Sequence, residues 1–74
     1  MGLDELQVAD SAVIEAIHTD AAMRRRLQDL GFAGQTTVTC VGKAPSGDPI
    51  AFGVRGAVIA LRREDCRRIR VRRV

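Results

Sequence analysis

The sequence predicts a mainly β fold: a five-stranded barrel with one short α-helix between the first two strands and a short helical turn before the last. The chain has 74 residues, which gives room for one hydrophobic core and one domain over residues 1–74. Short stretches of alternating or β-branched apolar residues recur along it, separated by turn residues. Only one stretch, residues 20–30, has helical periodicity.

The first strand is expected at residues 11–17. Ala12 and Ile14 alternate toward one face, but Ile17 is out of phase with them. A β-bulge near Glu15 and Ala16 restores the phase, because a bulge inserts one extra residue into a strand.

The helix is expected at residues 20–30. Three apolar residues at positions i, i+4 and i+7 form one stripe on it: Met23, Leu27 and Leu30. Thr19 or Asp20 supplies a side-chain oxygen for the first-turn amides. Gly31 follows the helix and suits the left-handed residue that ends many helices. Arg24, Arg25 and Arg26 fan around the helix, and at least one is expected to pair with a carboxylate.

Four further strands are expected at residues 36–41, 50–54, 57–61 and 69–71. A loop rich in proline and glycine, residues 44–49, separates the second strand from the third. Arg55-Gly56 is a tight hairpin turn, after which Ala57, Ile59 and Leu61 face inward, and residues 63–66 form the short helical turn. Five short strands in this order have the plan of an SH3-like barrel, in which closure hides the sheet edges.

The formal net charge is only +3, but the charges are unevenly distributed. Residues 1–20 contain no lysine or arginine and carry five carboxylates, those of Asp4, Glu5, Asp10, Glu15 and Asp20. Residues 62–74 carry Glu64 and Asp65 against seven arginines: Arg62, Arg63, Arg67, Arg68, Arg70, Arg72 and Arg73. The asymmetry indicates either an acidic partner or a solvated face that keeps a small protein soluble.

The chain offers no set of converging groups for catalysis, so we expect no enzyme, no catalytic residue and no cofactor. Cys40 and Cys66 are 26 positions apart, form no CxxC pair and are expected to be reduced, buried and structural. The one histidine, His18, lies at a strand end without an evident partner. We expect no metal site; His18 and Asp20 are the candidates for adventitious ion binding only. The apolar residues suffice for folding without a metal.

Composition also argues against several partners. With no Tyr or Trp and two Phe, one of them expected in the core, the chain cannot line a groove for proline-rich peptides or stack single-stranded bases. Arginines alone give weak, salt-sensitive phosphate binding, so no specific nucleic-acid partner is expected. No apolar run is long enough for a membrane helix, and the acidic N-terminus does not resemble a signal peptide. A cytoplasmic location is therefore expected.

Three stretches in register resemble the FeoA family, which accompanies the bacterial ferrous-iron transporter FeoB. They are residues 26–31 (RLQDLG), residues 44–50 (APSGDPI), and residues 54–63, followed by Ile69 and Val71. The resemblance runs from about Leu3 to Val71. Two departures are that Gly34-Gln35 stands where the family usually has Pro-Gly, and Cys66 where alanine is usual.

The resemblance implies an SH3-like barrel acting as a non-enzymatic cytoplasmic accessory of ferrous-iron transport. Its partner is then FeoB, through the GTP-binding part or its linker, and it reaches the membrane only indirectly. The family label also carries a generic metal-ion association. An assembly of several copies is left open. The alternative is a stand-alone regulatory domain related to the C-terminal domain of metal-dependent transcriptional repressors.

The expected partner-binding surface is the polar face of the helix, Arg24, Arg25 and Gln28, with Arg62 and Arg63 as a second contact. A barrel has few flat surfaces, and its one helix presents side chains that the core does not use. Arginine is enriched at interfaces because its planar fork bonds carboxylates with two hydrogen bonds. The competing interpretation is that these arginines only solvate the helix.

Overall fold

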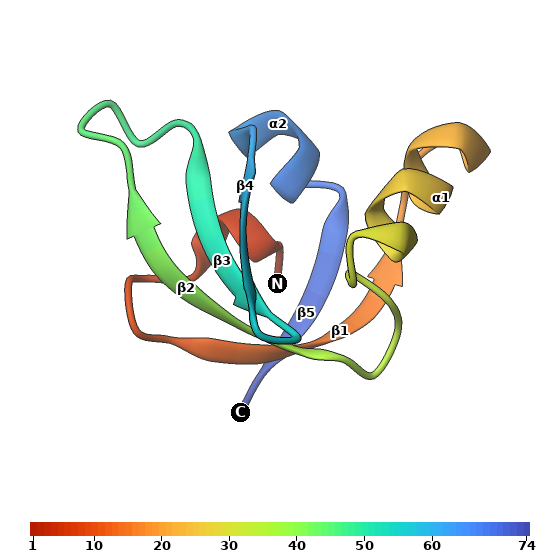
Figure 1. Ribbon diagram of the computed structural model, residues 1–74, viewed down its shortest axis with the longest axis horizontal. Helices are drawn as coiled ribbons and strands as arrows, with labels where there is room; N and C mark the ends of the chain where they lie inside the picture. Colours follow the sequence, from red (N-terminus) through yellow and green to blue (C-terminus); the bar gives the residue numbers. More distant parts are fainter.

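The computed structural model describes residues 1–74 and consists of one antiparallel five-stranded sheet with short helices around it (Figure 1). The strands are β1 (Ser11–Ile17), β2 (Thr37–Lys43), β3 (Ile50–Val54), β4 (Ala57–Leu61) and β5 (Ile69–Arg73). The helical segments are the 3₁₀ turn η1 (Leu3–Glu5), α1 (Ala21–Asp29) and α2 (Arg63–Cys66). The expected order of elements is confirmed.

The strands are arranged β4-β3-β2-β1-β5, so the first and last strands of the chain are neighbours. The β1–β5 register shifts between Ile14 and Ala16, which confirms the expected bulge. The bulge lets Ala12 and Ile14 be fully buried while Ile17 still packs against the core. A second register shift, between Cys40 and Gly42 in β2, was not anticipated.

Both ends of α1 are capped as the sequence indicates. The Asp20 carboxylate accepts a hydrogen bond from the Met23 backbone N–H at 2.8 Å. At the other end the Phe32 N–H donates to the Leu27 carbonyl and the Gly31 N–H to that of Gln28, at 2.8 and 3.0 Å. These two bonds form a Schellman motif, and Gly31 supplies its left-handed residue with φ +109°.

Fifteen buried apolar residues form one core, and it differs from the expected core at three places. Both phenylalanines are buried, with ring centroids 6.2 Å apart and planes at 88°, although only one was expected there. Leu30 is 43% exposed, so the inward stripe of α1 ends at Leu27. Ala57 is exposed, although its cross-strand partner Val54 is buried. Cys40 and Cys66 are buried and unpaired.

The sheet is not closed by hydrogen bonds between its end strands, contrary to the expectation that closure hides its edges. The outer edge of β5 is covered by the N-terminus: Gly2 bridges Arg70, and the Met1 carbonyl accepts from the Val71 N–H at 2.8 Å. The outer edge of β4 has no such cover. Only α2 joins β4 to β5 (Figure 1).

The turns follow the sequence closely. Arg55 and Gly56 have φ values of +50° and +81°, as a type I′ hairpin turn requires. The loop at residues 44–49 is tied to α2, because the Asp48 carboxylate accepts from the Arg63 N–H at 3.0 Å. None of the helices is long and apolar enough to cross a membrane.

Candidate protein-interaction surface

The acidic N-terminal and basic C-terminal segments pair with each other. Because β1 lies beside β5, Arg72 approaches Glu15 at 3.6 Å and Arg73 approaches Asp10 at 3.3 Å. Arg67 adds a contact of 3.9 Å with Asp4 in η1. Much of the charge asymmetry in the sequence is therefore balanced within the molecule, and the C-terminal segment is not a free cationic tract.

The cationic surface that remains centres on α1. The five ion pairs of the structure include none of Arg24, Arg25 and Arg26. All three are exposed, and Arg24 donates only to the Thr19 carbonyl at 3.3 Å. The expectation that one of them pairs with a carboxylate was wrong: Asp20 caps α1, Asp65 and Glu64 pair with Arg62, and Asp29 of α1 forms no ion pair with Arg25 or Arg26 although it lies one turn away.

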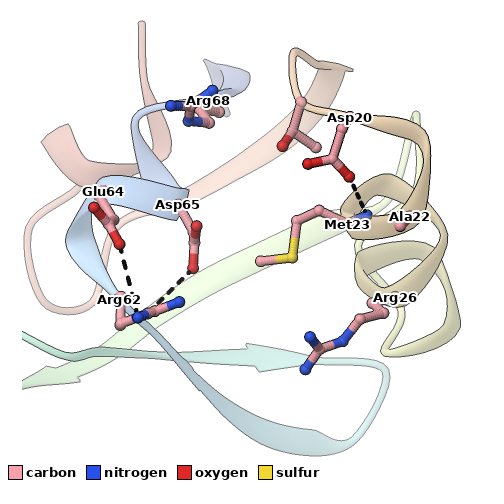
Figure 2. Close-up of a pocket in the computed structure, with 9 residues that line it drawn as sticks. Asp20, Ala22, Met23, Arg26, Arg62, Glu64, Asp65 and Arg68 are labelled. Atoms are coloured by element: carbon pink, nitrogen blue, oxygen red, sulfur yellow. Dashed lines mark hydrogen bonds and ion pairs between the residues drawn. The ribbon is translucent and has the colours of Figure 1, made fainter.

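A groove of about 440 Å³ separates α1 from α2 (Figure 2). Figure 2 shows Met23 pointing into it from α1, while Arg26 and Arg62 extend toward each other from its two sides. Arg62 is held on the α2 side by Asp65 at 3.6 Å and Glu64 at 3.8 Å. Arg26 and Arg68, which also lines the groove, have no ion-pair partner.

An adjoining groove of about 240 Å³ runs between α1 and the end of β4. It shares Met23, Arg26 and Arg62 with the first groove, and its other lining residues are mainly apolar: Leu27, Leu30, Ala60, Leu61 and Asp65. Leu30 is uncovered here because the Schellman turn redirects the chain just after it. The two grooves together combine an apolar floor with charged residues of both signs, among which Arg26 and Arg68 are the arginines without an ion pair.

The structure divides the five residues expected to bind a partner into two groups. Arg24, Arg25 and Gln28 are exposed on α1 but do not line the α1–α2 groove, whereas Arg62 does. Arg63 is half-buried at the start of α2. Sequence reasoning missed Arg26, the arginine that faces Arg62. Its spacing of three from Met23 and four from Leu30 was the available signal, since residues so spaced share a helix face.

The candidate metal-binding residues do not form a site. His18 is exposed at the end of β1, and the Asp20 carboxylate is occupied by the Met23 N–H. No three His, Cys, Asp or Glu side chains are grouped so as to hold a metal ion. The residues present therefore do not fit a resident metal.

Cys66 is buried in α2 and is not an activated nucleophile. Burial raises the pKa of its thiol from 9.0 to about 12, and the charges of Asp4, Asp65 and Asp48 act in the same direction, against a smaller opposing effect of Arg63. Only the thiolate is nucleophilic, so this side chain is inert near neutral pH.

Comparison with known proteins identifies the family. The FeoA domain model matches residues 1–73, nearly the whole chain. This chain belongs to the FeoA family. The FeoA resemblance seen in the sequence is thereby confirmed.

Several relatives extend the match. The chain is 37% identical over 71 residues to an Fe(2+) transport protein A/Fe(2+) transporter FeoB fusion protein of Porphyromonas gingivalis, covering 96% of this chain but only 8% of the fusion. The solution structure of FeoA from Chlorobium tepidum is 34% identical with a TM-score of 0.94, covering all of this chain and 70% of that one. FeoA of Stenotrophomonas maltophilia complexed with zinc is 37% identical with a TM-score of 0.83, covering 97% and 89%.

The Stenotrophomonas protein is described as a prokaryotic SH3 domain protein, so the mainly β, SH3-like fold expected from the sequence is confirmed. A manganese-dependent transcriptional repressor also matches, with a TM-score of 0.85, but at 17% identity and over 41% of its length. That likeness concerns the fold alone, and it gives the repressor-domain alternative no functional support.

Proposed function

We propose that this FeoA domain is a non-enzymatic cytoplasmic accessory of ferrous-iron transport that acts on a FeoB transporter. The observation that carries the proposal is the relative in which FeoA and FeoB are one polypeptide. Fusion keeps two domains at high effective concentration, which is of use only if they work together. The absence of an activated nucleophile or a grouped metal-ligand set agrees with a binding role.

The contact is assigned to the G-protein part of FeoB or its linker, through the arginine-bearing side of α1. Arg24, Arg25 and Gln28 are its centre, with Arg62 and Arg63 as a second contact. The support is that the α1 arginines lack carboxylate partners, so they can pair with acids of another protein without breaking an existing ion pair. Exposed arginines that have no ion pair within the molecule also increase the rate of association with an acidic partner.

The test is binding of the purified cytoplasmic part of FeoB to wild type and to the double variant Arg24→Glu, Arg25→Glu. The variant is expected to keep its fold, because exposed charges change stability by no more than about 0.5 kcal/mol. Binding should weaken, and more at low salt than at high salt, because salt screens the interaction between exposed charges.

The matched control is Arg55→Glu, Arg70→Glu, which makes the same charge change at two exposed arginines that have no carboxylate partner and lie outside α1. It should bind nearly as wild type does. Equal binding by the α1 variant at low salt would contradict the assigned surface, and a wild-type protein that does not bind FeoB would contradict the proposed function.

A further inference from the structure

The free edge of β4 is the least protected part of the sheet. Its residues, Ala57–Leu61, include no charged side chain and no proline, and Val58 is 68% exposed. Natural proteins guard edge strands with charges, prolines or covering segments, because an open edge pairs readily with another strand. The other edge has such guards: β5 carries arginines and is covered by Met1 and Gly2. The contrast indicates that the β4 edge is available to pair with a strand of another molecule.

The register defines which backbone groups are free. In a two-residue hairpin the closing pair, Val54 and Ala57, exchanges hydrogen bonds, and bonded and non-bonded pairs then alternate along the strands. Val58 and Ala60 fall on the non-bonded positions, so their N–H and C=O groups point away from β3. The backbone hydrogen bonds of the turns, loops and helix caps do not involve residues 57–61. These groups can therefore accept another strand without disturbing the fold.

The surface beside this edge has the chemistry of a binding groove. The groove between α1 and the end of β4 has Leu30 and Ala60 in its apolar lining. Its charged residues are Arg26, Arg62 and Asp65, of which Arg62 and Asp65 pair with each other and Arg26 has no ion pair. Figure 2 shows both guanidinium groups directed into the space between the elements. A strand added next to β4 lies about 4.8 Å from it, on the side that faces α1. Its alternate side chains then reach the apolar lining and the unpaired Arg26.

We propose that the β4 edge and this groove bind an extended acidic segment of a partner protein by strand addition. The Val58 and Ala60 backbone groups bond the segment, apolar side chains cover Leu30 and Met23, and a carboxylate pairs with Arg26, while Arg62 keeps its ion pairs with Glu64 and Asp65. In this mode backbone hydrogen bonds supply affinity and pockets for alternate side chains supply specificity. The inference rests on the proposed function only for the identity of the partner, a segment of FeoB.

Charge argues against a second copy of this chain as the occupant. Two β4 strands paired about a two-fold axis bring two sets of α1 arginines to the same junction. Each copy also carries a net charge of +3. Like charges at an interface are unfavourable, whereas an acidic segment neutralises the unpaired Arg26.

The experiment uses the full chain with two probes: the cytoplasmic part of FeoB, and a synthetic peptide Glu-Val-Glu-Leu-Asp-Val-Glu with a control peptide in which lysine replaces every acid. Amide hydrogen exchange is followed by NMR. In the free protein the Val58 and Ala60 amides should exchange faster than those of Ala57, Ile59 and Leu61. The acidic peptide should slow the first two selectively, and the lysine peptide should not.

The variant Ala60→Pro removes one outward N–H, and Ala60→Ser keeps it. Proline on an edge strand is tolerated where its missing N–H faces solvent. Peptide affinity should fall about tenfold in the proline variant, because one hydrogen bond to the peptide is lost and the adjacent one is weakened. It should stay unchanged in the serine variant. If Ala60→Pro does not fold, the exchange measurement on wild type decides.

The inference is overturned if the acidic peptide does not bind, if it binds without slowing these two amides, or if a folded Ala60→Pro variant binds it equally well. Slowing that depends on protein concentration without peptide would make a second copy the occupant. FeoB binding that leaves the β4 amides unchanged would refute the inference and keep the proposed function. Peptide binding at β4 by a protein that does not bind FeoB would keep the inference and refute the proposed function.

Discussion

The Arg72 guanidinium lies 3.6 Å from the Glu15 carboxylate, on the neighbouring strands β5 and β1. This contact joins the acidic start of the chain to its basic end. Both side chains are about half exposed, so the pair adds little to stability. The arginines without an ion pair include Arg24, Arg25 and Arg26 on α1 and Arg68 in the α1–α2 groove, and under the proposed function these are the ones available to an acidic partner.

Leu27→Gln is expected to destabilise the protein strongly. Leu27 is the only fully buried residue of α1, at 1% exposure, and it anchors the helix to the core. Burying a leucine side chain contributes about 1.5–3 kcal/mol, and a buried amide without partners costs about 1–3 kcal/mol more. Urea unfolding monitored by circular dichroism measures the change.

Leu30→Gln is the matched control, since Leu30 is on the same helix but 43% exposed. Its free energy of unfolding should change by less than about 0.5 kcal/mol, as for most surface substitutions. Equal losses in the two variants would mean that the apolar stripe is buried along its whole length.

Local signals made most of the fold predictable. The helix caps, the β-bulge near Glu15 and the Arg55-Gly56 turn each follow from a few adjacent residues whose chemistry dictates a backbone conformation. The bulge between Cys40 and Gly42 and the lack of β4–β5 pairing could not be predicted, because both depend on how distant strands curve around the core.

The candidate interaction surface was only partly predictable for the same reason. The helical pattern placed Arg24, Arg25 and Arg26 on α1, where they are exposed, but it did not predict that all three lack a carboxylate partner. It could not show that Arg72 and Arg73 are neutralised by β1, or that Arg26 faces Arg62 across a groove, because both relationships are made by tertiary packing. Leu30 illustrates the limit: its spacing matches the buried stripe, but the chain turns away before covering it.

Gly31→Ala is expected to destabilise the end of α1. Gly31 has φ +109°, which residues with a side chain rarely adopt, and an added Cβ would lie 3.3 Å from Val54 Cγ2. A loss of about 1 kcal/mol or more follows from backbone strain and crowding together. Gly34→Ala is the control, because no atom lies within 4 Å of its Cβ position and its φ is not positive. A melting temperature equal for both variants would contradict the left-handed cap.

Removing divalent metal ions should leave the fold unchanged. The core contains fifteen apolar residues, and no three potential ligands are grouped. The melting temperature should therefore be the same with and without EDTA. Titration with Zn²⁺ should give weak binding at most, reduced by His18→Ala without a change in stability. Tight stoichiometric binding, or a large drop in melting temperature with chelator, would show that a metal site has been missed.

Stability should fall at alkaline pH because of Cys66. Burial raises the pKa of its thiol to about 12 in the folded protein, whereas the ordinary value is 9.0. Above pH 9 the unfolded chain releases this proton while the folded protein keeps it. The unfolded state then binds fewer protons, so the free energy of unfolding decreases with pH, by up to about 1.4 kcal/mol per pH unit, until the folded thiol also ionises.

The variant Cys66→Ala isolates this effect, since it removes the thiol and little else from the α2 core position. Urea unfolding between pH 8 and pH 11 should show a steeper decline for wild type than for Cys66→Ala. In the native protein at pH 8, Cys66 should also resist Ellman's reagent, because a buried neutral thiol is a poor nucleophile. Parallel pH profiles for the two proteins, together with rapid labelling of native Cys66, would show that the thiol ionises normally and that α2 does not seal it from water.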